Sequence, residues 1–109
     1  MELSKFGKTI KAQVAAFRVN LRTNAKWALR ALVVLYEHQT SEEQTMGATY
    51  SDNGVGFTGF DGGILSSFAS QYQDRGFLSR RQMAILHKRM PKYARQLRDL
   101  TARKETASA

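Results

Sequence analysis

Apolar side chains recur every three or four residues in the first and last parts of the chain. One stripe lies near the N-terminus and consists of Leu3, Phe6, Ile10, Val14, Phe17 and Leu21. A second stripe lies near the C-terminus and consists of Met83, Leu86, Met90, Tyr93, Ala94, Leu97 and Leu100. Because residues at this spacing share one side of an α-helix, each stripe predicts an amphipathic helix.

Two further helices are predicted between these stripes. The segment from Trp27 to Tyr36 is apolar nearly all round, which is typical of a helix buried on most sides, and Asn24 can cap its start. A short amphipathic segment from Asp61 to Gln73 follows, and Gly76 is placed to end it in the left-handed conformation.

The last helix has a clear start and an interruption. Ser79 with Gln82 three residues later matches a capping box. Pro91 lies inside the apolar stripe and predicts a kink or a split, because proline removes one backbone hydrogen bond. The fold class is therefore all-α: a small bundle of four or five helices with a central glycine-rich loop. Residues 1–102 are predicted to form a single helical domain and residues 103–109 a flexible polar tail.

The glycine-rich stretch N-G-V-G-F-T-G-F-D at 53–61 contains a match to G-x-G-x-x-G. A dinucleotide site needs a buried strand before the first glycine and a helix starting within the motif. The preceding T-M-G-A-T-Y-S-D has no β-branched run, and Gly62 and Gly63 make a poor first helical turn, so the match is interpreted as accidental. Two alternatives remain. Phe57 and Phe60 pack into the core with Asp61 as a helix N-cap, or the loop displays Asn53, Phe57 and Phe60 as a contact surface.

Charge is unevenly distributed along the chain, whose net charge is +8. Residues 1–36 carry a net charge of +6, residues 37–74 carry −6 without a single lysine or arginine, and residues 75–109 carry +8. Segments of opposite sign indicate a polyanionic or an acidic partner.

The last helix carries the strongest functional signal. Arg81, Lys88, Lys92 and Arg95 fall within about 60° of one another on a helical projection, and Arg80 and Arg98 flank them. Such a ridge can neutralise several phosphates, although a merely solvated basic face has the same pattern. The helix at 61–73, the turn at 74–78 and the opening Arg80, Arg81 and Gln82 also resemble a helix-turn-helix, in which Arg and Gln can read bases.

Catalytic and metal-binding chemistry is not indicated. The chain has no cysteine and two histidines, neither of which has a second metal ligand at helical spacing. Asp52 and Asp61 flank the glycines but are weak evidence for acid–base catalysis. We therefore expect no enzyme activity, no metal and no cofactor. No apolar run approaches the roughly 20 residues that span a bilayer, so we expect a cytoplasmic protein that does not enter a membrane.

The C-terminal half resembles a small module found in phage- and plasmid-type proteins, alone or attached to DNA-helicase-like polypeptides. The resemblance covers residues 53–97 and is carried by N-G-V-G-F at 53–57, Asp61, L-S-S at 65–67, G-F-L-S-R-R-Q at 76–82 and K-Y-A-R-Q-L at 92–97. It implies an accessory protein of a mobile genetic element that acts near DNA, and it implies no catalytic residues.

The sequence thus predicts a nucleic-acid-binding accessory protein that grips phosphates through Arg80, Arg81, Lys88, Lys92, Arg95 and Arg98. DNA is favoured over RNA, and single strands remain open because aromatic loop residues can stack on bases. The alternative is a protein-interaction regulator or inhibitor that docks through the acidic middle and the glycine-rich loop. Whether Met- and Leu-rich faces pair two chains into a homodimer is also left open.

Overall fold

The computed structural model describes residues 2–46, 57 and 59–108, and every regular element among them is helical. The elements are the 3-10 helix η1 (Leu3–Phe6), α1 (Ile10–Thr23), α2 (Ala25–Met46), α3 (Gly59–Arg75), α4 (Arg80–Arg89), the 3-10 helix η2 (Met90–Tyr93) and α5 (Ala94–Ser108). The predicted all-α class is confirmed. A central glycine-rich loop is not shown, since residues 47–56 and 58 lie outside the described residues.

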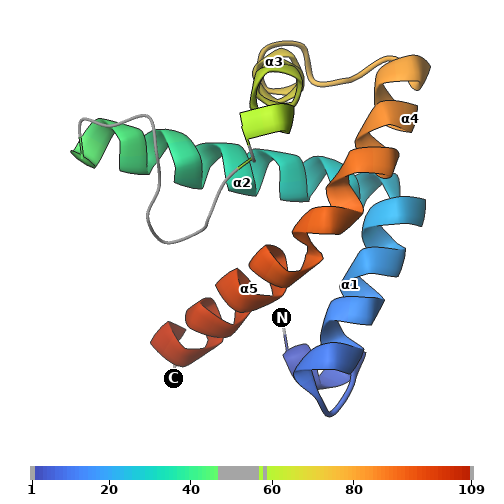
Figure 1. Cartoon of the computed structure of the whole chain (residues 1–109), viewed down its shortest axis with the longest axis vertical. Helices are drawn as coiled ribbons and strands as arrows, with labels where there is room; N and C mark the ends of the chain where they lie inside the picture. The colour runs from blue at the N-terminus through green and yellow to red at the C-terminus, as the bar shows by residue number, and fades with distance from the viewer. Residues whose placement is uncertain (1, 47–56, 58, 109) are drawn as a thin grey trace.

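The core lies where α1 and α2 pack against the C-terminal elements. α1 packs against η2 and α5, and α3 packs across the middle of α2 (Figure 1). α1 contributes Phe17 and Leu21, and α2 contributes Leu32 and Leu35. Tyr93 is the largest fully buried side chain. Both predicted apolar stripes therefore reach the core, although Ile10 of the first is 44% exposed.

The periodicity of the N-terminal stripe predicted one continuous helix, but the stripe is divided between η1 and α1. Gly7 separates η1 from α1 with a φ of +143°, and Thr9 caps α1 by accepting a hydrogen bond from the N–H of Ala12 at 3.1 Å. A Cβ at position 7 would lie 2.5 Å from the Cβ of Ala12, so this turn requires glycine. The stripe survives the break because Phe6 and Phe17 still meet, with ring centroids 5.1 Å apart.

The predicted local signals between the helices are confirmed. The Asn24 side chain accepts from the N–H of Trp27 at 3.2 Å, and Gly76 ends α3 with a φ of +83°. Ser79 and Gln82 form the full capping box: the Ser79 hydroxyl accepts from Gln82 N–H at 3.1 Å, and the Gln82 side chain accepts from Ser79 N–H at 2.8 Å.

Pro91 divides the last helical run. α4 ends at Arg89, the 3-10 segment η2 spans Met90–Tyr93, and α5 resumes at Ala94. Because proline has no N–H and its ring crowds the preceding turn, the α-helical ladder cannot pass through this position. α5 then continues to Ser108, so residues 103–108, predicted as a flexible tail, are helical. Glu105 fixes this end, since its carboxylate accepts from Leu3 N–H at 2.7 Å.

The glycines before and after Asp61 are part of α3, which begins two residues before the helix start predicted at Asp61. α3 begins at Gly59 and includes Gly62 and Gly63, and a Cβ added to any of the three meets no atom within 4 Å. Asp61 therefore lies inside the first turn and is not the N-cap. Tertiary contacts of Asp61, described below, hold this turn against the weak helix propensity of its neighbours.

We predict that Gly63→Ala raises the free energy of unfolding by about 0.5–1 kcal/mol, because alanine loses less backbone entropy in a helix and has open space here. The matched control is Gly76→Ala, which forces an alanine into the left-handed region and is expected to cost about 1 kcal/mol. Urea unfolding followed by circular dichroism measures both values. A destabilising Gly63→Ala would contradict the helical assignment of the α3 start.

Candidate nucleic-acid interface

The six cations expected to form one ridge are spread over three elements. Three lie in α4, one in η2 and two in α5: Arg80, Arg81 and Lys88; Lys92; Arg95 and Arg98. The 3-10 segment changes the angular register between α4 and α5, so one projection at 100° per residue does not apply across the run. The expectation of a continuous helical ridge is therefore corrected.

Lys92 is engaged inside the protein. Its ammonium donates to Asp61 at 2.6 Å, and the same carboxylate accepts from the Tyr93 hydroxyl at 2.7 Å and from the Arg89 guanidinium. Asp61 is fully buried, whereas the Lys92 side chain is 47% exposed. The ion pair between Lys92 and Asp61 joins the acidic middle of the chain to its basic C-terminal part. It also restrains the Lys92 ammonium from reaching a phosphate.

The surroundings of Asp61 lower its pKa. Burial alone would raise the pKa, but hydrogen bonds from Lys92, Tyr93 and Arg89, together with the charge of Lys92, outweigh it and lower the pKa from 3.8 to about 2. The carboxylate is thus ionised at neutral pH, and its negative charge is held by two cations. Asp61 in this setting is a structural anchor rather than a proton donor or acceptor for a substrate.

The two cations of α5 are also paired. The Arg95 guanidinium donates to Asp99 at 3.1 Å, and Arg98 donates to Asp99 at 2.9 Å and to the side chain of Gln13 at 2.9 Å. The pKa of Asp99 is lowered because hydrogen bonds from Arg98 and Arg95 outweigh the effect of burial. Gln13, which is buried, in turn donates to the carbonyl of Gly7 at 3.0 Å. Arg98 therefore joins α5 to α1 and is not a solvated cation.

The three cations of α4 have a different environment. Arg80, Arg81 and Lys88 are exposed, and none forms a salt bridge with a residue that the structure describes. α4 contains no acidic residue. Ala84, also exposed, lies between Arg81 and Lys88 on the same side. This exposed side of α4, made of Arg80, Arg81, Ala84 and Lys88, is hereafter the α4 basic face.

α1 carries a second group of exposed cations, and its C-terminal end meets the C-terminal half of α4. The two helices meet where Nδ1 of His87 donates to the carbonyl oxygen of Leu21 at 2.9 Å. α1 also lacks acids, and its exposed Lys11, Arg18 and Arg22 fall within about 40° of one another at 100° per residue. Arg22 and Lys88 are the next residues in the chain after Leu21 and His87, the two residues that form this contact. The sequence shows these α1 cations, but their position beside α4 depends on a contact between residues far apart in the chain.

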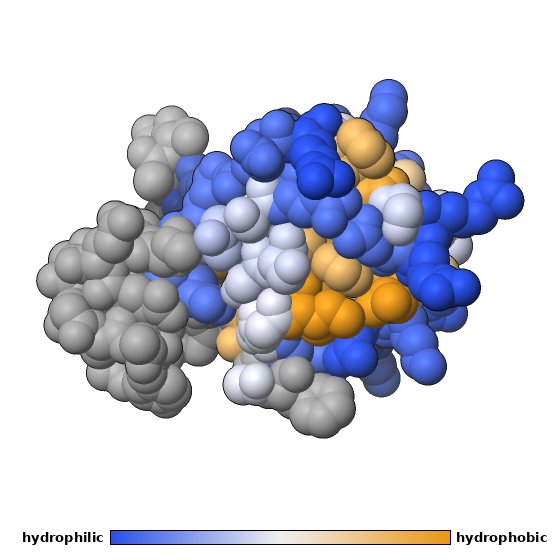
Figure 2. Space-filling view, turned by 90° about the horizontal axis from the view of Figure 1, so that it is seen from above, coloured by the Kyte–Doolittle hydropathy of each residue, from blue (hydrophilic) through white to orange (hydrophobic). Residues whose placement is uncertain are grey.

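α3 and α4 form a helix pair with a short turn. Four residues separate them, Gly76 to Ser79, and Figure 1 shows α3 nearly end-on while α4 runs across the view, so the helices cross steeply. On the half of the molecule where α4 begins, hydrophilic residues surround an apolar patch (Figure 2). A steep crossing with a three- or four-residue turn that contains glycine is the geometry of a helix-turn-helix. The turn is shorter than the predicted 74–78 segment because α3 continues to Arg75.

Gln82 is not available to read bases, contrary to the expectation from its position. Its side-chain oxygen accepts from Ser79 N–H within the capping box, and its amide exchanges two hydrogen bonds of 2.9 Å with the amide of Gln71. These contacts fix the angle between α3 and α4. Gln82 therefore has a structural role in the turn.

Of the three loop residues expected to form a contact surface, the structure describes the side chain of Phe57. Phe57 packs edge-on against Tyr93 with ring centroids 5.9 Å apart, and its N–H donates to Gln39 at 2.9 Å. This position of Phe57 agrees with the alternative in which its ring packs into the core. Asn53 and the side chain of Phe60 lie outside the described residues, so a contact surface on this loop stays a prediction.

Neither a metal-binding cluster nor a membrane-spanning helix is indicated in the described part of the chain. No group of three or more histidine, cysteine, aspartate or glutamate side chains there can hold a metal ion. Among the same residues, no helix is long and apolar enough to cross a membrane.

Comparisons with known proteins give no further guide. No protein-family model matches the chain, and neither the curated proteins nor the solved structures contain a match. The resemblance to modules of phage and plasmid proteins stays a prediction. A function has to be argued from the geometry of the described residues.

We predict that the free energy of unfolding falls as the pH drops from about 4 to about 2. Asp61 has a pKa of about 2 in the folded protein and about 3.9 when unfolded, so its stabilising effect is complete above pH 4 and is lost as pH falls through the folded value. At about 1.4 kcal/mol per pKa unit, this group contributes about 2.6 kcal/mol in all, of which about 2 kcal/mol is lost between pH 4 and pH 2. Urea unfolding at a series of pH values measures it.

We predict that Asp61→Asn lowers the free energy of unfolding by about 3 kcal/mol at pH 7, because it leaves two cations facing a neutral amide. The control is Asp99→Asn, whose partly exposed pairs predict a loss of 1 kcal/mol or less. Asp61→Asn should also flatten the decline between pH 4 and 2. Equal losses in the two variants would contradict the anchoring role of Asp61.

Proposed function

We propose that the protein binds duplex DNA, with α4 as the helix that enters a groove and α1 as a flanking contact to the backbone. The observation that carries this proposal is the α4 basic face, which is acid-free and lies at the end of a steeply crossed helix pair. In helix-turn-helix proteins the second helix enters the major groove and its first residues meet the bases. Arg80 and Arg81 occupy those first positions.

The local electrostatics of α4 support an anionic ligand. A helix N-terminus carries a partial positive charge, so acidic residues are favoured in the first turn and basic ones are disfavoured by about 0.3–1 kcal/mol each. α4 has no acid in that turn and instead begins with Arg80 and Arg81. This unfavourable placement becomes favourable when a phosphate lies near the helix start.

The position of α1 supports contacts with more than one phosphate. Lys11, Arg18 and Arg22 lie on an acid-free helix that touches α4, so the basic surface spans two elements. A basic surface of this kind can follow the DNA backbone while the neighbouring helix lies in the groove. Six cations are available in total: Lys11, Arg18, Arg22, Arg80, Arg81 and Lys88.

Duplex DNA fits better than a single strand. Stacking on unpaired bases requires accessible aromatic rings, and Phe57, one of the expected stacking residues, packs against Tyr93. The six-cation ridge of the sequence prediction is accordingly reduced to Arg80, Arg81 and Lys88, and α1 replaces Lys92, Arg95 and Arg98. A role in a mobile genetic element, a protein partner and homodimerisation each stay predictions.

We predict that the affinity for a 20-base-pair duplex falls steeply between 50 and 200 mM salt. The loss is about 40-fold if three phosphates are neutralised and about 2,000-fold if six are. The triple variant Arg80→Gln/Arg81→Gln/Lys88→Gln should reduce the slope of log K against log salt by about 3 and weaken binding at least tenfold at 100 mM. Fluorescence polarisation with a labelled duplex measures both.

The matched control is Lys5→Gln/Lys8→Gln/Arg103→Gln, which removes the same charge from exposed positions outside α1 and α4. It should leave the slope nearly unchanged. Equal effects of the two triple variants would mean that net charge rather than the α4 basic face attracts DNA. Absence of salt-dependent binding would refute the proposal.

A further inference from the structure

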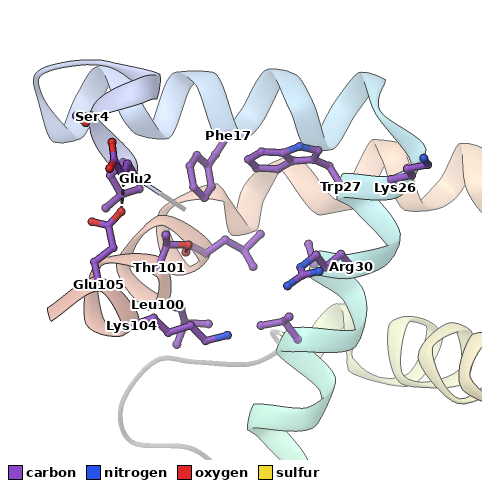
Figure 3. A pocket seen from close by; sticks show the side chains of 14 residues that line it. Glu2, Ser4, Phe17, Lys26, Trp27, Arg30, Leu100, Thr101, Lys104 and Glu105 are labelled. Atoms are coloured by element: carbon purple, nitrogen blue, oxygen red, sulfur yellow. Dashed lines mark hydrogen bonds between the residues drawn. The ribbon is translucent and has the colours of Figure 1, made fainter. Parts of the chain in front are cut away.

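A pocket of about 840 Å³ lies between η1, α1, α2 and α5, away from the α4 basic face (Figure 3). Its lining includes the apolar side chains of Phe17, Trp27, Leu97 and Leu100 and the cations Arg30 and Lys104. Pockets for small molecules have volumes of about 300–1,000 Å³ and are lined mainly by apolar side chains with a few polar groups. This pocket has such a volume, and most of its lining surface is apolar, although half of its 14 lining residues are polar or charged.

The interior of the pocket is apolar and preformed. Phe17 contacts Trp27 edge to face with centroids 5.0 Å apart, and Trp27 also contacts Phe6 at 5.6 Å. Leu97 and Leu100 of α5 form the opposite side and are buried by the same packing. Because ring contacts hold Trp27 from two sides, its position does not depend on a ligand. A hydrocarbon chain placed here would lose its contact with water against fixed apolar walls.

Two cations frame the opening from opposite helices. Figure 3 shows the side chains of Arg30 from α2 and Lys104 from α5 directed toward each other across the pocket, whereas Lys26 points away from it. Neither Arg30 nor Lys104 forms a salt bridge within the part of the chain that the structure describes. Glu105, the acid nearest to Lys104 in sequence, is engaged with the N–H of Leu3.

This combination of charge and apolar surface selects the ligand. Two unpaired cations of the same sign repel each other, and a carboxylate between them would offset this repulsion and form charge-assisted hydrogen bonds with both. A polyphosphate would leave most of its charge against apolar walls, which is costly. A neutral apolar molecule would form no ion pair with either cation, neither of which has a salt bridge to the pocket's own acids, Glu2 and Glu105.

We propose that this pocket binds an anionic amphiphile, specifically a monocarboxylate with a medium-length hydrocarbon chain. The carboxylate lies between Arg30 and Lys104, and the chain contacts Phe17, Trp27 and the leucines of α5. The site shares no residue with the proposed DNA interface, so it does not depend on the proposed function.

Trp27 is the single tryptophan of the chain, so intrinsic fluorescence reports directly on the pocket. The probe is decanoate with a bromine at its terminal carbon, used below its micelle concentration, because bromine quenches tryptophan only at close range. Saturable quenching is expected with the native protein. The double variant Arg30→Gln/Lys104→Gln should bind at least tenfold more weakly while its thermal unfolding stays close to that of the native protein.

Two controls make the test decisive. Lys8→Gln/Arg75→Gln removes the same charge outside the pocket and should bind the probe like the native protein. The brominated ten-carbon alcohol should quench at least tenfold more weakly than the acid.

Several results would overturn the proposal. Equal quenching by acid and alcohol would show a plain apolar groove, and equal weakening by the two charge variants would show attraction to net charge. Protein-concentration-dependent shielding of Trp27 without probe, with a doubled mass in solution, would show that a second copy of the chain occupies the pocket. Absence of saturable quenching would refute the site outright.

Discussion

The buried carboxylate of Asp61 is the interaction on which the arrangement of the C-terminal half depends. Among the side chains of α3 that the structure describes, the buried core contains Leu65, Phe68 and Ala69. The position of α3 is fixed by donors from the two segments around Pro91: Arg89 at the end of α4, and Lys92 and Tyr93 in η2. A fully buried charge is tolerated only when it is paired and hydrogen-bonded, so α3 and the α4–η2 junction have to meet in this one way.

This constraint also determines which cations a ligand can reach. Around the Pro91 junction and in α5, Arg89, Lys92, Arg95 and Arg98 are all engaged with carboxylates. Arg80, Arg81 and Lys88 of α4, before the junction, are exposed instead. Within the predicted ridge, the break in the helix therefore separates cations that stabilise the fold from cations that can meet a partner, although both kinds have the same spacing in the sequence.

Local features could be predicted from the sequence, and long-range ones could not. The capping box of Ser79 and Gln82, the left-handed Gly76 and the cap at Asn24 each depend on residues within four positions, so their signals are intact in the sequence. The Asp61 cluster joins residues about 30 positions apart, and nothing in the spacing of Arg89 marks it as a partner. Likewise, Gly62 and Gly63 oppose a helix locally, and tertiary contacts overrule them.

Net charge cannot by itself explain selectivity in a molecule of this kind. With a charge of +8, the chain attracts any anion over about one Debye length, roughly 10 Å at 0.1 M salt. Discrimination has to come from what lies between the cations. On α4 this is Ala84, a small exposed side chain on a narrow helix that a groove can accommodate. Between Arg30 and Lys104 it is an apolar cavity that a hydrated phosphate backbone cannot enter without losing its water. The same charge therefore supports two different ligands, because the surface beneath it differs.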